Sequence, residues 1–209
     1  TWNMIQGLQL SAFVSYGRTL SSRKTYSPTT ISTSVGSATI ANTERTDIMG
    51  NVQLSYVKAI GKHEINALAL VEAQKVDNFT SSMSASNFDT DKFGFNNMAA
   101  GAVVKYGNLS SNATANQLLS YMARINYMYD NRYVITANAR ADGSSKLGKN
   151  NKWGFFPSAS VAWIISNEQF MKGAKALNSL KLRVGYGVTG NQDAITAYNS
   201  LQVMTPNGI

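Results

Sequence analysis

The stretch WGFFPSASVAWIIS, residues 153–166, decides the fold class because its apolar and small polar residues alternate. One face of the expected strand carries Trp153, Phe155, Pro157, Ala159, Val161, Trp163 and Ile165, and the other carries Ser158, Ser160 and Ala162. The two tryptophans are ten residues apart, which is roughly 33 Å of strand at about 3.3 Å per residue. Tilted by about 40°, such a strand covers roughly 25 Å, the height of the lipid-facing band of a membrane β-barrel. The stretch therefore predicts a transmembrane strand.

The same alternation predicts a series of long strands along the chain. We expect them over residues 4–19, 45–60, 63–76, 117–129, 133–142, 153–166 and 179–189, with another beginning near Tyr198. Tight turns at 61–62 and 130–132 alternate with longer polar stretches at 20–43, 77–116 and 143–152, and a short, partly helical connection is expected over 167–178. Membrane barrels combine short periplasmic turns with long outer loops. The fold class is therefore all-β, a segment of a large antiparallel transmembrane β-barrel of about seven or eight strands.

Composition excludes several other classes of protein. The chain of 209 residues has no cysteine and a single histidine, so disulfides, cysteine-based metal sites and histidine-rich sites are ruled out. It contains no paired acids or nucleophile–base set, which predicts that it is no enzyme and needs no cofactor. The net charge of +8 is scattered and no nucleic-acid motif accompanies it. The first ten residues lack a signal-peptide pattern, so we expect an interior piece of a longer protein.

Polar residues on the inward face of the strands are the candidate site. In the strand over 179–189, Lys181 and Arg183 alternate with apolar residues. The whole predicted lumen-facing set is Arg124, Asn126, Asn138, Arg140, Lys181 and Arg183. These side chains either hold an internal domain or line a path for a polar substrate, or they only reflect the wet interior of a barrel.

Basic residues also gather where the outer rim of the barrel is expected. They are Arg140, Lys146, Lys149 and Lys152. This group could meet lipopolysaccharide phosphates at the membrane surface, or it could form a solvated loop, because charges alone give no geometry.

Two runs, residues 131–170 and 177–198, resemble the SusC/RagA family of TonB-linked outer-membrane proteins of Bacteroidetes. The matching residues include the turn Asp142, Gly143, Ser144 and Ser145, the strand residues Trp153, Gly154 and Pro157, and the later residues Gly187, Gly190, Asn191 and Gln192. Ala141, Lys152 and Ala162 depart from the family pattern. From their chemistry, we expect Asp142 and Gly143 to supply a positive-φ position where the chain leaves the strand and Pro157 to cause a bulge or local irregularity.

The resemblance implies a larger assembly in the outer membrane of a Bacteroidetes-like Gram-negative cell. The whole protein would be a barrel of about 22 strands with a plug in its lumen, and residues 1–209 would be part of that single barrel domain, without the plug or signal peptide. It would import oligosaccharides or peptides with a SusD-like lipoprotein and with energy from TonB, ExbB and ExbD.

Two alternatives remain open at the level of sequence. One is a passive outer-membrane porin, which would need neither plug nor TonB. The other is a secreted carbohydrate-binding β-sandwich, which would bury Ile135, Trp163 and Val184 between two stacked sheets, since the inner faces of a sandwich form its core.

Overall fold

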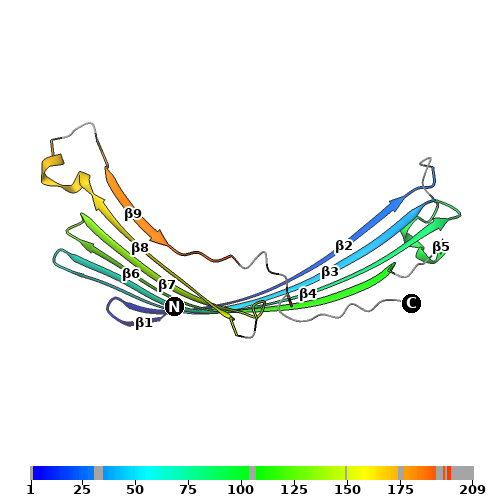
Figure 1. Cartoon of the computed structure of the whole chain (residues 1–209), viewed down its shortest axis with the longest axis horizontal. Helices are drawn as coiled ribbons and strands as arrows, with labels where there is room; N and C mark the ends of the chain where they lie inside the picture. Colours follow the sequence, from blue (N-terminus) through cyan, green and yellow to red (C-terminus); the bar gives the residue numbers. More distant parts are fainter. Residues whose placement is uncertain are drawn as a thin grey trace. The chain divides into compact units, whose positions relative to one another are not determined.

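The computed structural model describes residues 2–30, 35–103, 107–148, 150–173, 177–191, 195 and 197–198, and most of them lie in β-strands (Figure 1). The strands are β1 (Trp2–Ile5), β2 (Leu8–Ser27), β3 (Ser37–Ile60), β4 (His63–Phe88), β5 (Gly101–Val103), β6 (Leu109–Tyr129), β7 (Tyr133–Ser144), β8 (Trp153–Ile164) and β9 (Lys181–Gly187). Four single-turn 3₁₀ helices join them: η1 (Gly94–Asn96), η2 (Met98–Ala100), η3 (Ile165–Asn167) and η4 (Gln169–Met171). Among the described residues, no helix is long and apolar enough to cross a membrane.

The strands form one sheet in which neighbours in sequence are mostly neighbours in space. The order is β1-β2-β3-β4-β6-β7-β8-β9, and the short β5 pairs with β4. The pairs β6–β7, β7–β8 and β8–β9 are antiparallel and keep an unbroken register. The predicted all-β class with about seven or eight antiparallel strands is confirmed, since eight strands follow the main path.

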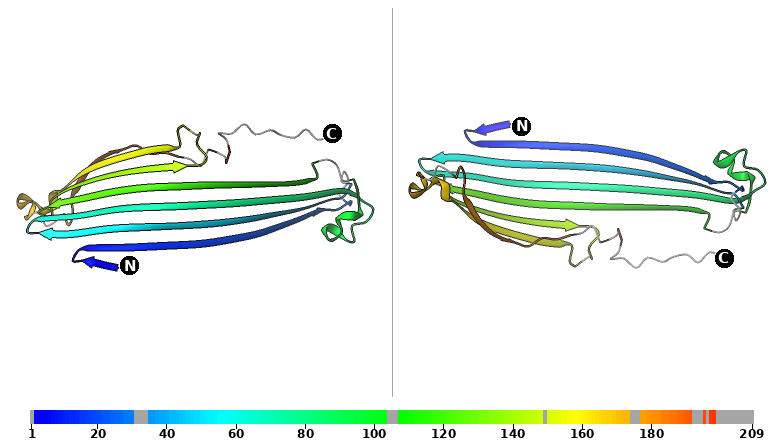
Figure 2. Two further views of the ribbon diagram at one scale, coloured as in Figure 1. Left: turned by 90° about the horizontal axis from the view of Figure 1, so that it is seen from below. Right: turned by 90° about the horizontal axis from the view of Figure 1, so that it is seen from above.

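The chain divides into two compact units, which we describe separately. Unit 1 comprises residues 1–15, 49–74 and 117–201, and unit 2 comprises residues 16–48, 75–116 and 202–209. Within unit 1, β6, β7 and β8 lie side by side (Figure 2). Unit 2 holds the outer parts of β2, β3, β4 and β6 together with η1, η2 and β5.

In unit 1 the residues that share one face of the sheet are apolar and exposed. Register places Tyr127, Ile135, Val161 and Val184 in one row across β6, β7, β8 and β9. Ile135 is 50% exposed and Val184 63%. Trp163, on the same face of β8, is 36% exposed. The β-sandwich alternative is therefore wrong, because it requires these side chains in a shared interior.

Unit 2 contains a small core beside its polar loops. Ala38, Ala85 and Phe88 are buried, and Tyr26, Phe95, Met98 and Ala100 pack against them. The loop that carries η1 is tied to β2 through Asp91, whose carboxylate accepts hydrogen bonds from the Tyr26 hydroxyl (2.6 Å) and the Thr29 hydroxyl (2.7 Å). Those bonds hold the pKa of Asp91 below its ordinary value. The loop is thus an ordered structure built on the strand ends.

Several predicted boundaries are wrong. The stretches 20–43 and 77–116 were expected to be irregular, yet β2, β3, β4 and β6 continue well into them. Their Ser- and Thr-rich sequences have no apolar face, so alternation gives no signal there. The strand expected over 4–19 is two strands, β1 and β2, because the chain turns at Gly7 with φ +84°. In the connection expected over residues 167–178, the described residues 167–173 and 177–178 include the end of η3 and all of η4. The strand expected from Tyr198 lies almost wholly outside the described residues.

The two expected irregularities of the family motif are also wrong. β7 continues through Gly143, whose φ is not positive, and pairs it with Trp153. A Cβ at Gly143 would lie 2.9 Å from the Trp153 ring, so the position needs glycine for space. Pro157 pairs with Ala139 without any shift of register, so no bulge forms in the β7–β8 ladder.

The β6–β7 turn gives a direct test of this fold. Asp130 and Asn131 have φ +50° and +52°, and Arg132 N donates to Tyr129 O at 2.9 Å. Valine in the left-handed region costs about 1–2 kcal/mol, so Asn131→Val should lower the free energy of unfolding of the protein in detergent by that order. Asn131→Gly should retain wild-type stability in the same urea titration, and equal losses in the two variants would contradict the turn geometry.

Candidate functional site

The polar face of unit 1 carries hydrogen-bonded rows of side chains that cross the strands. Arg124 Nε donates to Asn138 Oδ1 at 2.7 Å, and Asn138 Nδ2 donates to Ser158 Oγ at 3.1 Å. Register continues this row to Gly187 on β9. One row therefore joins four strands, because alternate residues of paired strands face the same side.

Two further contacts extend this face. Thr136 Oγ1 donates to Asn126 Oδ1 at 2.7 Å. Arg140 Nε donates to both Asp142 carboxylate oxygens at 2.8 Å, and its Nη2 donates to the buried Ser120 hydroxyl at 2.9 Å. The charge of Arg140 is therefore paired within the wall.

Three other cations of the predicted set have no carboxylate partner among the described residues. Lys181 and Arg183 are exposed on β9, where register places them opposite Ile164 and Ala162. Arg124 bonds the amide of Asn138 rather than an acid. In the described part of the chain, then, the structure aligns all six predicted polar residues on one face and leaves net positive charge there.

Two serines of the family motif form hydrogen bonds that join strand ends in unit 1. Ser144 is buried, and its N–H donates to Lys152 O at 2.9 Å. Ser145 N donates to Gln117 O at 2.9 Å, and Gln117 N donates to Ser145 Oγ at 2.8 Å. Together these bonds join β6, the end of β7 and the residue before β8.

Close neighbouring side chains leave no room for a Cβ at three further motif glycines. The Phe156 ring lies against Gly154 and Gly190, where an added Cβ would approach it to 2.6 Å and 2.3 Å. A Cβ at Gly187 would lie 2.8 Å from the Ser158 Cβ. Asn191 is exposed beyond β9, and Gln192 lies outside the described residues, as does Lys149 of the predicted basic rim.

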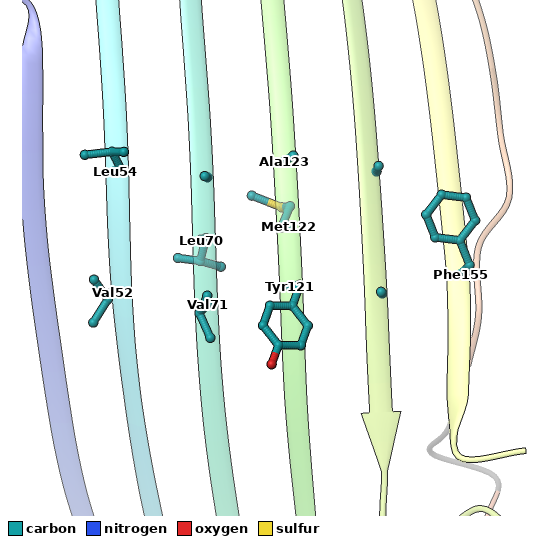
Figure 3. Close-up of a pocket in the computed structure, with 11 residues that line it drawn as sticks. Val52, Leu54, Leu70, Val71, Tyr121, Met122, Ala123 and Phe155 are labelled. Atoms are coloured by element: carbon teal, nitrogen blue, oxygen red, sulfur yellow. The ribbon is translucent and has the colours of Figure 1, made fainter. Parts of the chain in front are cut away.

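The opposite, apolar face carries a shallow hollow of about 470 Å³ (Figure 3). It is lined by four alanines and by larger apolar side chains: Ala69, Ala123, Ala139 and Ala141, and Val52, Leu54, Leu70, Val71, Tyr121, Met122 and Phe155. Trp153 stacks on Tyr121 with ring centroids 5.8 Å apart. Small-molecule sites combine apolar walls with a few placed polar groups. The near absence of such groups here makes this face suited to hydrocarbon rather than to a specific polar ligand.

The tight-turn end of unit 1 carries a charged network that the sequence did not predict. Glu168 is buried, and its Oε1 accepts hydrogen bonds from Tyr133 OH (2.8 Å) and Trp163 Nε1 (3.0 Å), while Arg132 Nη1 lies 3.2 Å from Oε2. Arg132 also pairs with Asp130 at 3.2 Å.

Two further contacts extend this network to the β3–β4 turn. Lys62 of the β3–β4 turn pairs with Asp130 at 3.2 Å, and His63 Nδ1 lies 2.7 Å from Tyr127 OH. The contacts therefore link the three connections that follow β3, β6 and β8. In the described residues, no group of acids and histidine is arranged to hold a metal ion.

The sequence is similar to several curated TonB-dependent receptors, although no protein-family model matches it. It is 33% identical over 203 residues to TonB-dependent receptor P3 of Formosa agariphila, which covers 96% of this chain and 20% of that protein. It is 33% identical over 145 residues to TonB-dependent receptor SusC of Bacteroides thetaiotaomicron, covering 68% of this chain and 14% of that protein. The chain thus spans about a fifth or less of the length of these relatives.

Solved structures show the same arrangement of strands. The structure of the RagAB peptide transporter matches 99% of this chain and 23% of its own, with a TM-score of 0.81 and 25% identity. The RagAB peptide importer in its closed-closed state matches 94% of this chain and 22% of its own, with a TM-score of 0.71 and 26% identity.

The Glu168 network predicts a dependence of stability on pH. The hydrogen bonds from Tyr133 and Trp163, helped by Arg132, hold the pKa of Glu168 below its ordinary value of 4.5. A carboxylate with a lowered folded pKa stabilises the fold above its unfolded pKa and loses that contribution as the pH falls through the folded pKa. As the pH falls from about 5 to 3, the midpoint temperature of thermal unfolding of the wild-type receptor should therefore decrease.

The matched variant is Glu168→Gln, which keeps the shape of the side chain and removes the charge. It should be less stable than wild type at pH 7 and show a flatter profile as the pH falls. Parallel profiles for the two proteins would contradict this role of Glu168.

Proposed function

Because the chain is a SusC/RagA-like TonB-dependent receptor segment, we propose that it forms part of the wall of an importer in the outer membrane of a Bacteroidetes-like Gram-negative cell. The observation that carries the proposal is the division of unit 1 into an exposed apolar face and a hydrogen-bonded polar face on one sheet. A barrel wall meets lipid on one side and water on the other. Residues 1–209 then belong to one barrel domain, with the plug outside this segment.

In this proposal the polar rows face the lumen. Arg124, Lys181 and Arg183 lack carboxylate partners among the described residues. Their charges are therefore available to a plug or to a passing polar substrate. Arg140 is already paired with Asp142, and its part is to hold the wall together.

The remaining components of the mechanism follow the similarity to SusC and RagAB. A SusD-like lipoprotein would close the outer side, and TonB, ExbB and ExbD would supply energy from the inner membrane. The cargo class is an oligosaccharide or a peptide. The wall itself performs no covalent chemistry and needs no cofactor, so the protein is a transporter and not an enzyme.

An uptake experiment separates this proposal from a passive porin. Cells that lack the gene should fail to take up one member of a panel of oligosaccharides and peptides, and complementation should restore uptake. Inactivating TonB in the complemented strain should abolish that uptake as well. Uptake that persists without TonB would favour the porin and overturn active import.

The orientation of the two faces can be tested with two neighbouring substitutions on β8. Ala159 lies on the apolar face and Ser158 on the polar face. Arginine on the lipid side near the bilayer midplane costs about 2–4 kcal/mol. Ala159→Arg should therefore reduce the free energy of unfolding from liposomes, measured by urea titration, by that order. Ser158→Arg should cost much less in the same urea titration, because Gly187 opposite leaves it room. A reversed order would mean that the faces are misassigned.

A further inference from the structure

The segment that follows β8 lies on the apolar side of the tight-turn end of unit 1. Glu168, between η3 and η4, accepts hydrogen bonds from Tyr133 and Trp163. Unbroken register from Trp163 back to Trp153 places both donors on the same face as Phe155, which borders the apolar hollow. Asn167 Nδ2 also donates to Asn131 O at 2.6 Å. The segment is therefore attached at the rim and on the side of the hydrophobic band.

The exposed side chains of this segment include an aromatic ring and a cation, beside the uncharged polar Asn167 and Gln169. Phe170 is 68% exposed. Lys172 is exposed and has no carboxylate partner among the described residues. The one acid of the segment, Glu168, is buried and satisfied by three donors. The exposed surface of the segment thus carries an apolar ring, uncharged polar groups and a positive charge, while its one negative charge is paired inside.

This combination matches the chemistry of a membrane–water boundary. Aromatic residues concentrate there, with an apolar ring toward the lipid. Lysine beside the boundary interacts with the negative phosphates of lipid headgroups. Trp163 and Tyr133 would normally direct their N–H and O–H to headgroups or water, but here they donate to Glu168, so the segment replaces those headgroups at this part of the rim.

We propose that residues 165–173 are an interfacial anchor, in which Phe170 enters the acyl-chain boundary of the periplasm-facing leaflet and Lys172 meets phospholipid phosphates. The inference rests on the proposed function, since that function places the tight-turn end at the periplasmic side. It adds a lipid-binding element beyond the strands of the wall. Glu168 is its positioning residue, because it ties the segment to Trp163 and Tyr133.

Spin-label accessibility tests the anchor in the full-length receptor. Single labels at Phe170→Cys, Val161→Cys and Ser160→Cys would be introduced into a cysteine-free receptor in phospholipid liposomes, and collisions with oxygen and with a water-soluble nickel complex would be measured. Val161 and Ser160 are adjacent on β8 and face opposite sides. The label at position 170 should resemble that at 161, with oxygen access exceeding nickel access.

The controls separate failure of the anchor from failure of the barrel. If position 161 is lipid-exposed while position 170 is open to nickel or shielded from both reagents, the anchor is overturned and the barrel stands. Shielding from both reagents would indicate a protein partner on this surface. If position 161 itself is not lipid-exposed, the proposed membrane wall fails as well.

A second variant tests the positioning role of Glu168. Combining Glu168→Gln with the label at position 170 should raise nickel access there, because the segment loses its charged attachment. The label at position 161 should not change. An unaltered signal at position 170 would remove Glu168 from the anchor.

Discussion

The constraint on which this structure depends is that the backbone must satisfy its own hydrogen bonds, because almost nothing else holds the strands together. Only five apolar side chains are buried among the described residues: Ala38, Val76, Ala85, Phe88 and Ala162. A soluble domain of this size would have a large core. Here the ladders between neighbouring strands take that place, and in hydrocarbon an unpaired backbone group costs several kcal/mol. The apolar face contributes its free energy by contact with lipid rather than with a second protein layer.

The tight turns of unit 1 and the long loop of unit 2 are stabilised by different interactions. At the tight-turn end, the connections that follow β3, β6 and β8 are linked by ion pairs among Lys62, Asp130, Arg132 and Glu168. In unit 2, Asp91 holds a long loop against β2 through neutral hydroxyl donors, beside a small aromatic core. Short turns have no room for a core, so ion pairs between oppositely charged side chains stabilise that end. The longer loop has enough chain to bury apolar groups.

The sequence predicted the strands whose two faces differ in polarity, and little of the structure at the strand ends. Alternation identified β8 to within two residues and the placement of Arg124, Asn138 and Arg183 on one face. It failed for the parts of β2 and β4 in unit 2, since their Ser- and Thr-rich sequences have no apolar face. Glu168 gave no signal because its partner Tyr133 is 35 residues away. Gly143 was misread because sequence shows a turn residue where the structure needs space for Trp153.

Side-chain size follows the same division of faces as polarity. On β9 the apolar face carries Leu182, Val184 and Tyr186, while Gly185 and Gly187 face Ser160 and Ser158 on the other side. A wall that closes into a barrel has less room inside than outside, so small residues on the inner face reduce crowding there. They also leave a flat surface that a plug or a polymer can approach closely. In the proposed orientation, the glycines that complete the polar rows line the lumen, and the larger residues of the opposite face contact lipid.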